Sequence, residues 1–214
     1  MISPEHLWPY VIASVLIILA PGPSVLFTIA RAVAWGRTIA LMTVAGNALG
    51  MLVLSAGVAI GLGPILQSSA LLYSIVQWAG GFYLIWMGID AIRHRVIAAS
   101  DMTDTSGGKP RRLVTLRQGF IVGVLNPKAV VFFAAVLPQF VEPDFGSVTV
   151  QLLSLGALFS GLAFVFDGMW GIVAGTAREW LGSHPKRLVT LRIAGGCVMI
   201  LLGVAILFTT PLPW

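Results

Sequence analysis

Charged residues are scarce in this sequence of 214 residues. Only 10% are Asp, Glu, Lys or Arg, whereas a soluble domain carries about 25%. Hydrophobic residues make up 57%, and the mean hydropathy is +0.94. No folded chain of this length could hide so much apolar surface from water, so lipid is the expected solvent. The composition excludes soluble enzymes, disordered chains and secreted disulfide scaffolds. The single cysteine, Cys197, excludes an internal disulfide.

Motifs of catalysis are also missing. The sequence contains no His-Glu-x-x-His, no Gly-x-Ser-x-Gly and no phosphate-binding loop. The three histidines, His6, His94 and His184, stand near a terminus or in polar segments. We therefore expect a protein that is not an enzyme, with no cofactor and no metal site.

Six apolar stretches of about 20 residues or more are present, and each is long enough to cross a bilayer as a helix. They cover residues 8–30, 39–62, 71–92, 118–140, 148–177 and 191–210. A polar segment, residues 93–117, separates the third from the fourth, and residues 101–108 within it read as a flexible loop. The sequence predicts an all-α integral membrane protein with six transmembrane helices, in one domain over residues 1–214.

The basic residues predict the orientation of these helices. Twelve of the thirteen lie in the loops after the first, third and fifth stretches. They are Arg31, Arg37, Arg93, Arg95, Lys109, Arg111, Arg112, Arg117, Arg178, Lys186, Arg187 and Arg192. Basic loops stay in the cytoplasm, so both termini are expected outside. Because the bases follow topology, the pI near 10.0 does not indicate a nucleic-acid partner.

An inverted repeat is predicted from two correspondences between the halves of the chain. Ala79-Gly80-Gly81, Ile85 and Gly88 recur 115 residues later as Ala194-Gly195-Gly196, Ile200 and Gly203. The first and fourth stretches are both interrupted by proline, at Pro21-Gly22-Pro23 and at Asn126-Pro127. Three helices per half reverse the direction of the second half. We expect one repeat over about residues 8–92 and another over about 118–210, with a binding site at their interface.

Four unusual residues are predicted to lie at the same depth. Gly22 and Asn47 are nine and ten residues from the basic residue that follows or precedes their stretch. Lys128 and Asp167 are each eleven residues from theirs. At 1.5 Å per residue these are depths of about 13–16 Å, close to the middle of a hydrocarbon core about 30 Å thick.

The two proline breaks leave backbone carbonyls without helical partners, because Pro21, Pro23 and Pro127 have no N–H. Lipid cannot satisfy these carbonyls, so each break must face protein or a water-filled cavity. One interpretation is a packing kink. The other is that the breaks line a binding site, with Ser24 and Asn126 beside them.

Lys128 and Asp167 are the ionisable residues deepest within the stretches, where a charge costs about 2.5–3.5 kcal/mol on insertion scales. They could form a static ion pair between two helices. Alternatively, Asp167 binds a proton or an amine, and Lys128 binds a carboxylate. Asn47 and Ser24 could hydrogen-bond a polar solute or simply join helices.

Small residues four apart predict close helix packing. The pairs are Gly46–Gly50, Gly57–Gly61, Gly119–Gly123 and Gly171–Gly175. Such faces also permit a homodimer.

Several segments together resemble the LysE/RhtB superfamily of bacterial amino-acid exporters. They are Pro21-Gly22-Pro23-Ser24 with Arg31 and Gly36-Arg37, residues 78–88, Asn126-Pro127-Lys128 continuing to Leu137-Pro138-Gln139-Phe140, and the sixth stretch around Gly195 and Gly203. Asp167 stands where this family often carries an acid. One difference is Gly50-Met51-Leu52, where many relatives have a polar or acidic residue, and this favours a less polar solute.

The resemblance implies an inner-membrane exporter of small amino acids or related zwitterions, driven by protons through alternating access. Its site would contain Pro21–Ser24, Asn47 and Asn126–Lys128, with Asp167 coupling to protons. Two alternatives are a passive channel or structural subunit, and an exporter of another solute. A metal cation is disfavoured, because His, Cys and paired carboxylates are missing from the midplane.

Overall fold

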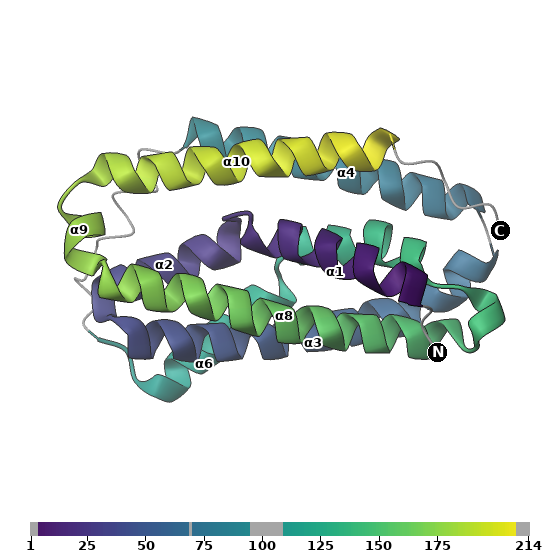
Figure 1. Ribbon diagram of the computed structural model, residues 1–214, viewed down its shortest axis with the longest axis horizontal. Coiled ribbons are helices and arrows are strands. Elements are labelled where there is room, and N and C mark those ends of the chain that lie inside the picture. The colour runs from purple at the N-terminus through teal and green to yellow at the C-terminus, as the bar shows by residue number, and fades with distance from the viewer. Residues whose placement is uncertain (1–3, 69, 95–108, 209–214) are drawn as a thin grey trace.

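All six apolar stretches form helices in the computed structural model, which describes residues 4–68, 70–94 and 109–208 (Figure 1). Five helical segments are long and apolar enough to cross a membrane, and the number is six if the bent pair α1 and α2 is one broken span. These described residues contain helices and turns and no strand. The all-α membrane fold is thus confirmed. The predicted flexible loop, residues 101–108, lies outside the described residues, as do residues 209–210 of the sixth stretch.

The chain forms nine α-helices in its described part and three irregular helical segments, which follow one another between residues 132 and 145. In chain order they are α1 (Pro4–Leu19), α2 (Pro23–Trp35), α3 (Arg37–Ser68), α4 (Ala70–Arg93), α6 (Arg112–Val124), α7 (Pro127–Val131), the π-helix η1 (Phe132–Val136), the 3₁₀ turns η2 (Leu137–Phe140) and η3 (Pro143–Phe145), α8 (Val148–Thr176), α9 (Arg178–Gly182) and α10 (Pro185–Phe208).

Several basic residues that the sequence places in loops lie on helices. α10 begins at Pro185 rather than near residue 191, so Lys186 and Arg187 belong to it, and α2 continues past Arg31. The Arg31 guanidinium lies 4.6 Å from the centre of the Trp35 ring. Aromatic faces accept such cations, and long basic side chains bury their stems while the charged head stays near water. These helices therefore extend beyond the apolar residues by which they were predicted.

The helices form two groups (Figure 1). α4 and α10 run side by side along one edge of the molecule, while α1, α2, α3, α6 and α8 pack together below them in the view. The turn between α2 and α3, the end of α4 and the short α9 all lie at the left-hand end, and α1 begins at the right-hand end. We call the left-hand end, with Arg37, Arg93, Arg178 and Arg187, the basic end.

Glycines set the closest contact between α3 and α6. A Cβ atom on any of four glycines would fall 2.0–2.2 Å from a backbone oxygen of the other helix. They are Gly46, Gly50, Gly119 and Gly123. Such close approach is typical of helices associating in lipid, where packing replaces the hydrophobic driving force. The prediction is also confirmed for Gly175, but it is wrong for Gly57–Gly61, because no atom of the described residues lies within 4 Å of a Cβ at either position.

α4 and α10 meet through the residues of the sequence echo. A Cβ on Gly88 would lie 2.5 Å from the Gly196 oxygen, and one on Gly203 would lie 2.6 Å from the Gly81 oxygen. The offset of 115 residues pairs Gly81 with Gly196 and Gly88 with Gly203. Replacing each glycine of one contact by its counterpart therefore gives the other contact. The contacts at this interface are therefore reciprocal.

We predict that Gly119→Ala destabilises the protein by about 1–3 kcal/mol, the usual cost of overpacking. The new methyl group would fall 2.2 Å from the Thr43 oxygen, and the backbone of α3 cannot yield as a side chain could. Gly57→Ala is the matched control, because its Cβ meets open space. Thermal unfolding in detergent should show a lower Tm for Gly119→Ala alone. Equal Tm values for the two variants would contradict the contact.

Candidate functional site

The break between α1 and α2 sits at Pro21-Gly22-Pro23. Gly22 is extended, with φ −81° and ψ −173°, and the two helix axes differ by 50°. In an unbroken helix, the Ile17 and Leu19 carbonyls would accept from the N–H groups of residues 21 and 23. Both residues are proline, so these two carbonyls lose their helical partners.

Lys128 supplies part of what the break removes. Its Nζ donates to the Ile17 oxygen at 2.8 Å and to the Ala20 oxygen at 2.9 Å. The side chain is only 3% exposed. A cation at the C-terminal end of α1 also interacts favourably with the helix dipole. Lys128 therefore joins the second half of the chain to the broken helix of the first half.

Asn126 joins the same two breaks through other atoms. Its Oδ1 accepts from the Lys128 backbone N–H at 3.2 Å and so caps α7. Its Nδ2 donates to Ser24 Oγ at 3.1 Å. Both Asn126 and Ser24 are buried. One amide thus fixes the start of α7 against the start of α2.

The two breaks are equivalent in form. Gly22 and Asn126 precede α2 and α7, and a proline is the first residue of each helix. Ser24 and Lys128 are the second residues. Asn126 donates to Ser24, and a Cβ on Gly22 would lie 3.2 Å from Lys128 Nζ. The residue before each helix therefore lies against the second residue of the other helix. The breaks therefore cross each other with matching partners.

Glycines of α4 and α10 also meet the two breaks in corresponding ways. A Cβ on Gly195 would lie 2.1 Å from the Pro21 oxygen, and one on Gly80 would lie 2.8 Å from Val131 Cγ1 in α7. The same 115-residue offset relates Gly80 to Gly195. Each break is thus covered by the glycine of one helix from the α4–α10 pair.

Asp167 lies with Asn47 in a second buried cluster. Asn47 Nδ2 donates to Asp167 Oδ2 at 3.1 Å, and Asp167 is 2% exposed. The other oxygen, Asp167 Oδ1, has no hydrogen-bond partner among the described residues, and the same holds for Asn47 Oδ1. A buried acid and amide therefore retain two free acceptor atoms, which is uncommon unless a ligand or water serves them.

Lys128 and Asp167 do not form a salt bridge within the described part of the chain. Their charges interact electrostatically across the space between the clusters. The backbone also connects the clusters, because the Asn47 oxygen lies against Gly123, three residues before Asn126. The hypothesis of a static, direct ion pair is wrong, and each charge has other partners.

Most residues of the predicted site come together in these two clusters. Pro21, Gly22, Ser24, Asn126 and Lys128 form the first, and Asn47 and Asp167 form the second. Two differ in burial, since Pro23 is exposed and Pro127 is half-buried. Their rings start helices instead of facing the buried centre.

Thr28 is a residue that the sequence reasoning missed. It is fully buried, and its Oγ1 has no partner among the residues described. Its methyl group lies 3.3 Å from the place of a Cβ on Gly171, one turn beyond Asp167 on α8. The available signal was spacing, because Thr28 follows Ser24 by one turn of α2 and shares its face.

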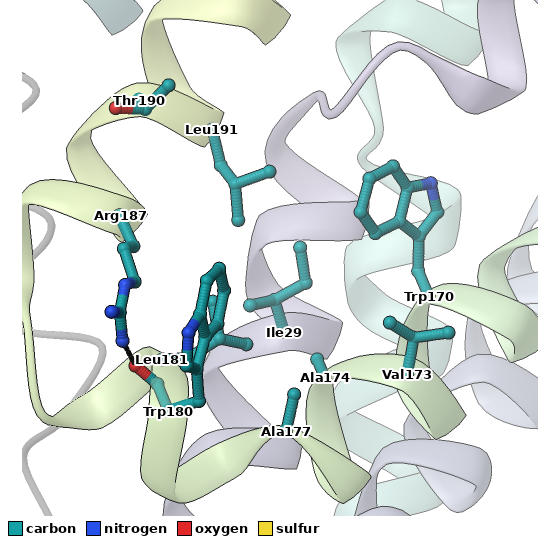
Figure 2. Close-up of a pocket in the computed structure, with 10 residues that line it drawn as sticks. All are labelled: Ile29, Trp170, Val173, Ala174, Ala177, Trp180, Leu181, Arg187, Thr190 and Leu191. Carbon is teal, nitrogen blue, oxygen red and sulfur yellow. Dashed lines mark hydrogen bonds between the residues drawn. The ribbon is translucent and has the colours of Figure 1, made fainter.

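An apolar cavity of about 320 Å³ lies between α2, α8, α9 and α10 near the basic end (Figure 2). Ile29, Trp170, Ala174 and Leu191 are among the side chains that border it. A second cavity, of about 230 Å³, lies between α1, η1, η2 and α10, and Leu16 and Phe140 are among its lining residues.

Comparison with known proteins identifies the family of the chain. The family model of the LysE type translocator matches residues 15–210. The chain belongs to the LysE type translocator family. This match confirms the family resemblance that the two proline motifs indicated. It also agrees with the membrane fold described above.

Named relatives of this LysE-family chain include efflux proteins. The homoserine/homoserine lactone efflux protein of Salmonella typhimurium is 30% identical over 199 residues, 93% of this chain and 94% of the relative. The leucine efflux protein of an Enterobacter species is 25% identical over 161 residues, 75% of each chain. An uncharacterized membrane protein of Vibrio cholerae is 31% identical over 64% of this chain and 66% of its own length. No solved structure matches.

We predict that Lys128→Met lowers stability by about 1–3 kcal/mol, the cost of leaving buried polar groups unpaired. The Ile17 carbonyl would lose its Lys128 donor, and the Ala20 carbonyl would keep only the Gly22 N–H, while the side-chain volume stays nearly the same. Lys186→Met, on the exposed surface of α10, is the control. A Lys128→Met protein with an unchanged Tm in detergent would contradict the capping role.

Proposed function

We propose that this LysE-family protein exports small amino acids or related zwitterionic metabolites across the bacterial inner membrane. The observation that carries the proposal is the buried pair of opposite charges that do not contact each other. Lys128 is held at the crossing of two helix breaks, and Asp167 keeps one carboxylate oxygen free. Separate buried charges of both signs suit a solute that carries both. The efflux proteins among the relatives support the same conclusion.

The substrate ammonium is assigned to the Asp167 cluster. Asp167 Oδ1, Asn47 Oδ1 and Thr28 Oγ1 are buried acceptors without partners among the described residues. An ammonium group has three N–H donors and no acceptor, so it matches such a set. Asp167 would exchange this ammonium for a proton and thereby couple export to the proton gradient.

The substrate carboxylate is assigned to the crossing of the breaks. Lys128 donates two hydrogen bonds to backbone oxygens and has a third N–H to offer. The N-terminus of α2 adds the favourable end of a helix dipole. Pro21, Gly22, Ser24, Asn126 and Pro127 would shape this part of the site, and Pro23 would act through the position of α2.

Alternating access between inverted repeats is the proposed mechanism. It is supported by the equivalent breaks, by the reciprocal glycine contacts of α4 and α10, and by the cover that each break receives from Gly80 or Gly195. Two cavities lie toward opposite ends of α10. Movement of the α4–α10 pair over the breaks would open one route while closing the other. A homodimer is also proposed, since Gly57 and Gly61 leave a small-residue face without neighbours in the described chain.

Asp167→Asn tests the proposed coupling role. We expect efflux of labelled amino acids from proteoliposomes with an imposed pH gradient to fall about a hundredfold or more, the contribution typical of a positioned proton-transfer group. Asp90→Asn is the control, because this acid pairs with His94 at 2.9 Å near the basic end. Unchanged efflux for Asp167→Asn would return Asp167 to a structural role. Export only down the solute's own gradient would favour the passive channel.

The proposed orientation predicts which serines a membrane-impermeant maleimide reaches in intact cells. In a Cys197→Ser background, we expect Ser147→Cys to be labelled and Ser183→Cys to be protected. Ser147 precedes α8 and Ser183 follows α9, and both are exposed. Permeabilised cells should label both. The reverse pattern would place the basic end outside.

A further inference from the structure

We propose that the apolar cavity at the basic end receives the side chain of the exported amino acid, which makes the protein selective for large aliphatic or aromatic amino acids. This inference rests on the proposed export function and adds the identity of the substrate class. The cavity, which we call the side-chain pocket, is lined by ten residues. They are Ile29, Trp170, Val173, Ala174, Ala177, Trp180, Leu181, Arg187, Thr190 and Leu191.

The lining gives a polar side chain almost nothing to bind. Figure 2 shows Ile29, Leu191 and Trp170 directed toward a common space from α2, α10 and α8. The two polar lining residues are already engaged: Thr190 Oγ1 donates to the Lys186 oxygen at 3.0 Å, and the Arg187 guanidinium stacks 3.9 Å from the Trp180 ring centre. A hydroxyl or charge entering the pocket would lose its water without gaining a partner.

The side-chain pocket adjoins the proposed ammonium site along two helices. On α8, Trp170 and Ala174 follow Asp167 by three and seven residues, spacings that place them on one helix face. Ala174 is therefore about 10 Å from Asp167 toward the basic end. On α2, Thr28 with its free hydroxyl directly precedes Ile29 of the pocket. An amino acid held at Asp167 and Thr28 can thus direct its side chain past Trp170 and Ile29.

Trp170 provides a further observation that points to a ligand. Its indole Nε1 is buried and has no hydrogen-bond partner among the residues the structure describes. In Figure 2 the six-membered ring faces Ile29 and Leu191, and the nitrogen lies on the side away from them. The indole therefore has an apolar face for a side chain and, at its other edge, a free donor for a polar atom of the solute.

The size of the pocket decides which side chains benefit. A volume of about 320 Å³ holds a leucine, isoleucine or phenylalanine side chain, whereas the methyl group of alanine would leave it nearly empty. Each methylene buried in an apolar site improves discrimination by roughly tenfold or more. Selectivity should therefore rise with the apolar size of the side chain.

The test is the ratio of leucine to alanine efflux from proteoliposomes that contain purified protein. Ala174→Leu fills the pocket, so we expect leucine efflux to fall more than alanine efflux and the ratio to fall about tenfold. Ala177→Leu, at the half-buried end of α8, should lower the ratio in the same direction without disturbing the helix core. Ala157→Leu is the matched control, because Ala157 is exposed on the same helix and is not part of the pocket.

Each outcome is decisive when the variants are monodisperse and equally reconstituted. An unchanged ratio in both pocket variants would overturn the inference, and so would an equal loss of leucine and alanine efflux. A wild-type protein that exports alanine but not leucine would overturn the pocket's role while the export function stands. A wild-type protein that exports no amino acid would overturn the proposed function, and this inference with it.

Discussion

Every backbone polar group inside a bilayer needs a partner within the protein, and the rest of this structure depends on how that requirement is met at Pro21-Gly22-Pro23. Two prolines remove two donors from the first span. A lysine from the fourth span then donates to the carbonyl of Ile17, which has lost its helical partner, and to that of Ala20. The break in one half of the chain is therefore completed by a residue from the other half.

The same arrangement separates the two buried charges. Lys128 is occupied by backbone oxygens, and Asp167 is bound by Asn47, so neither needs the other as a contact partner. A direct ion pair would have satisfied both groups and closed the centre to a solute. Because each charge has its own partners, acceptor atoms of Asp167 and Thr28 remain free among the described residues. In the proposed mechanism, the apolar space next to them would receive the side chain, while the buried polar groups bind the charged backbone.

The sequence alone predicts features that depend on local composition. Apolar length predicted the spans, prolines predicted the breaks, and the rarity of charge within apolar stretches indicated Lys128 and Asp167. Features created by packing were not predictable in the same way. The carbonyls that Lys128 binds belong to residues more than a hundred positions earlier, and the side-chain pocket is made by four helices. Gly57–Gly61 and Gly119–Gly123 have the same spacing, yet within the part of the chain that the structure describes only the second pair meets a neighbouring helix.

The sequence distance between Lys128 and Ile17 has a consequence for biogenesis. The chain is made from its N-terminus, so α1 enters the membrane well before residue 128 has left the ribosome. Until then the Ile17 carbonyl lacks the donor that it has in the finished protein. The first half of the chain alone therefore lacks a donor that its own broken helix needs, and the helix break is completed only when the second half has been made.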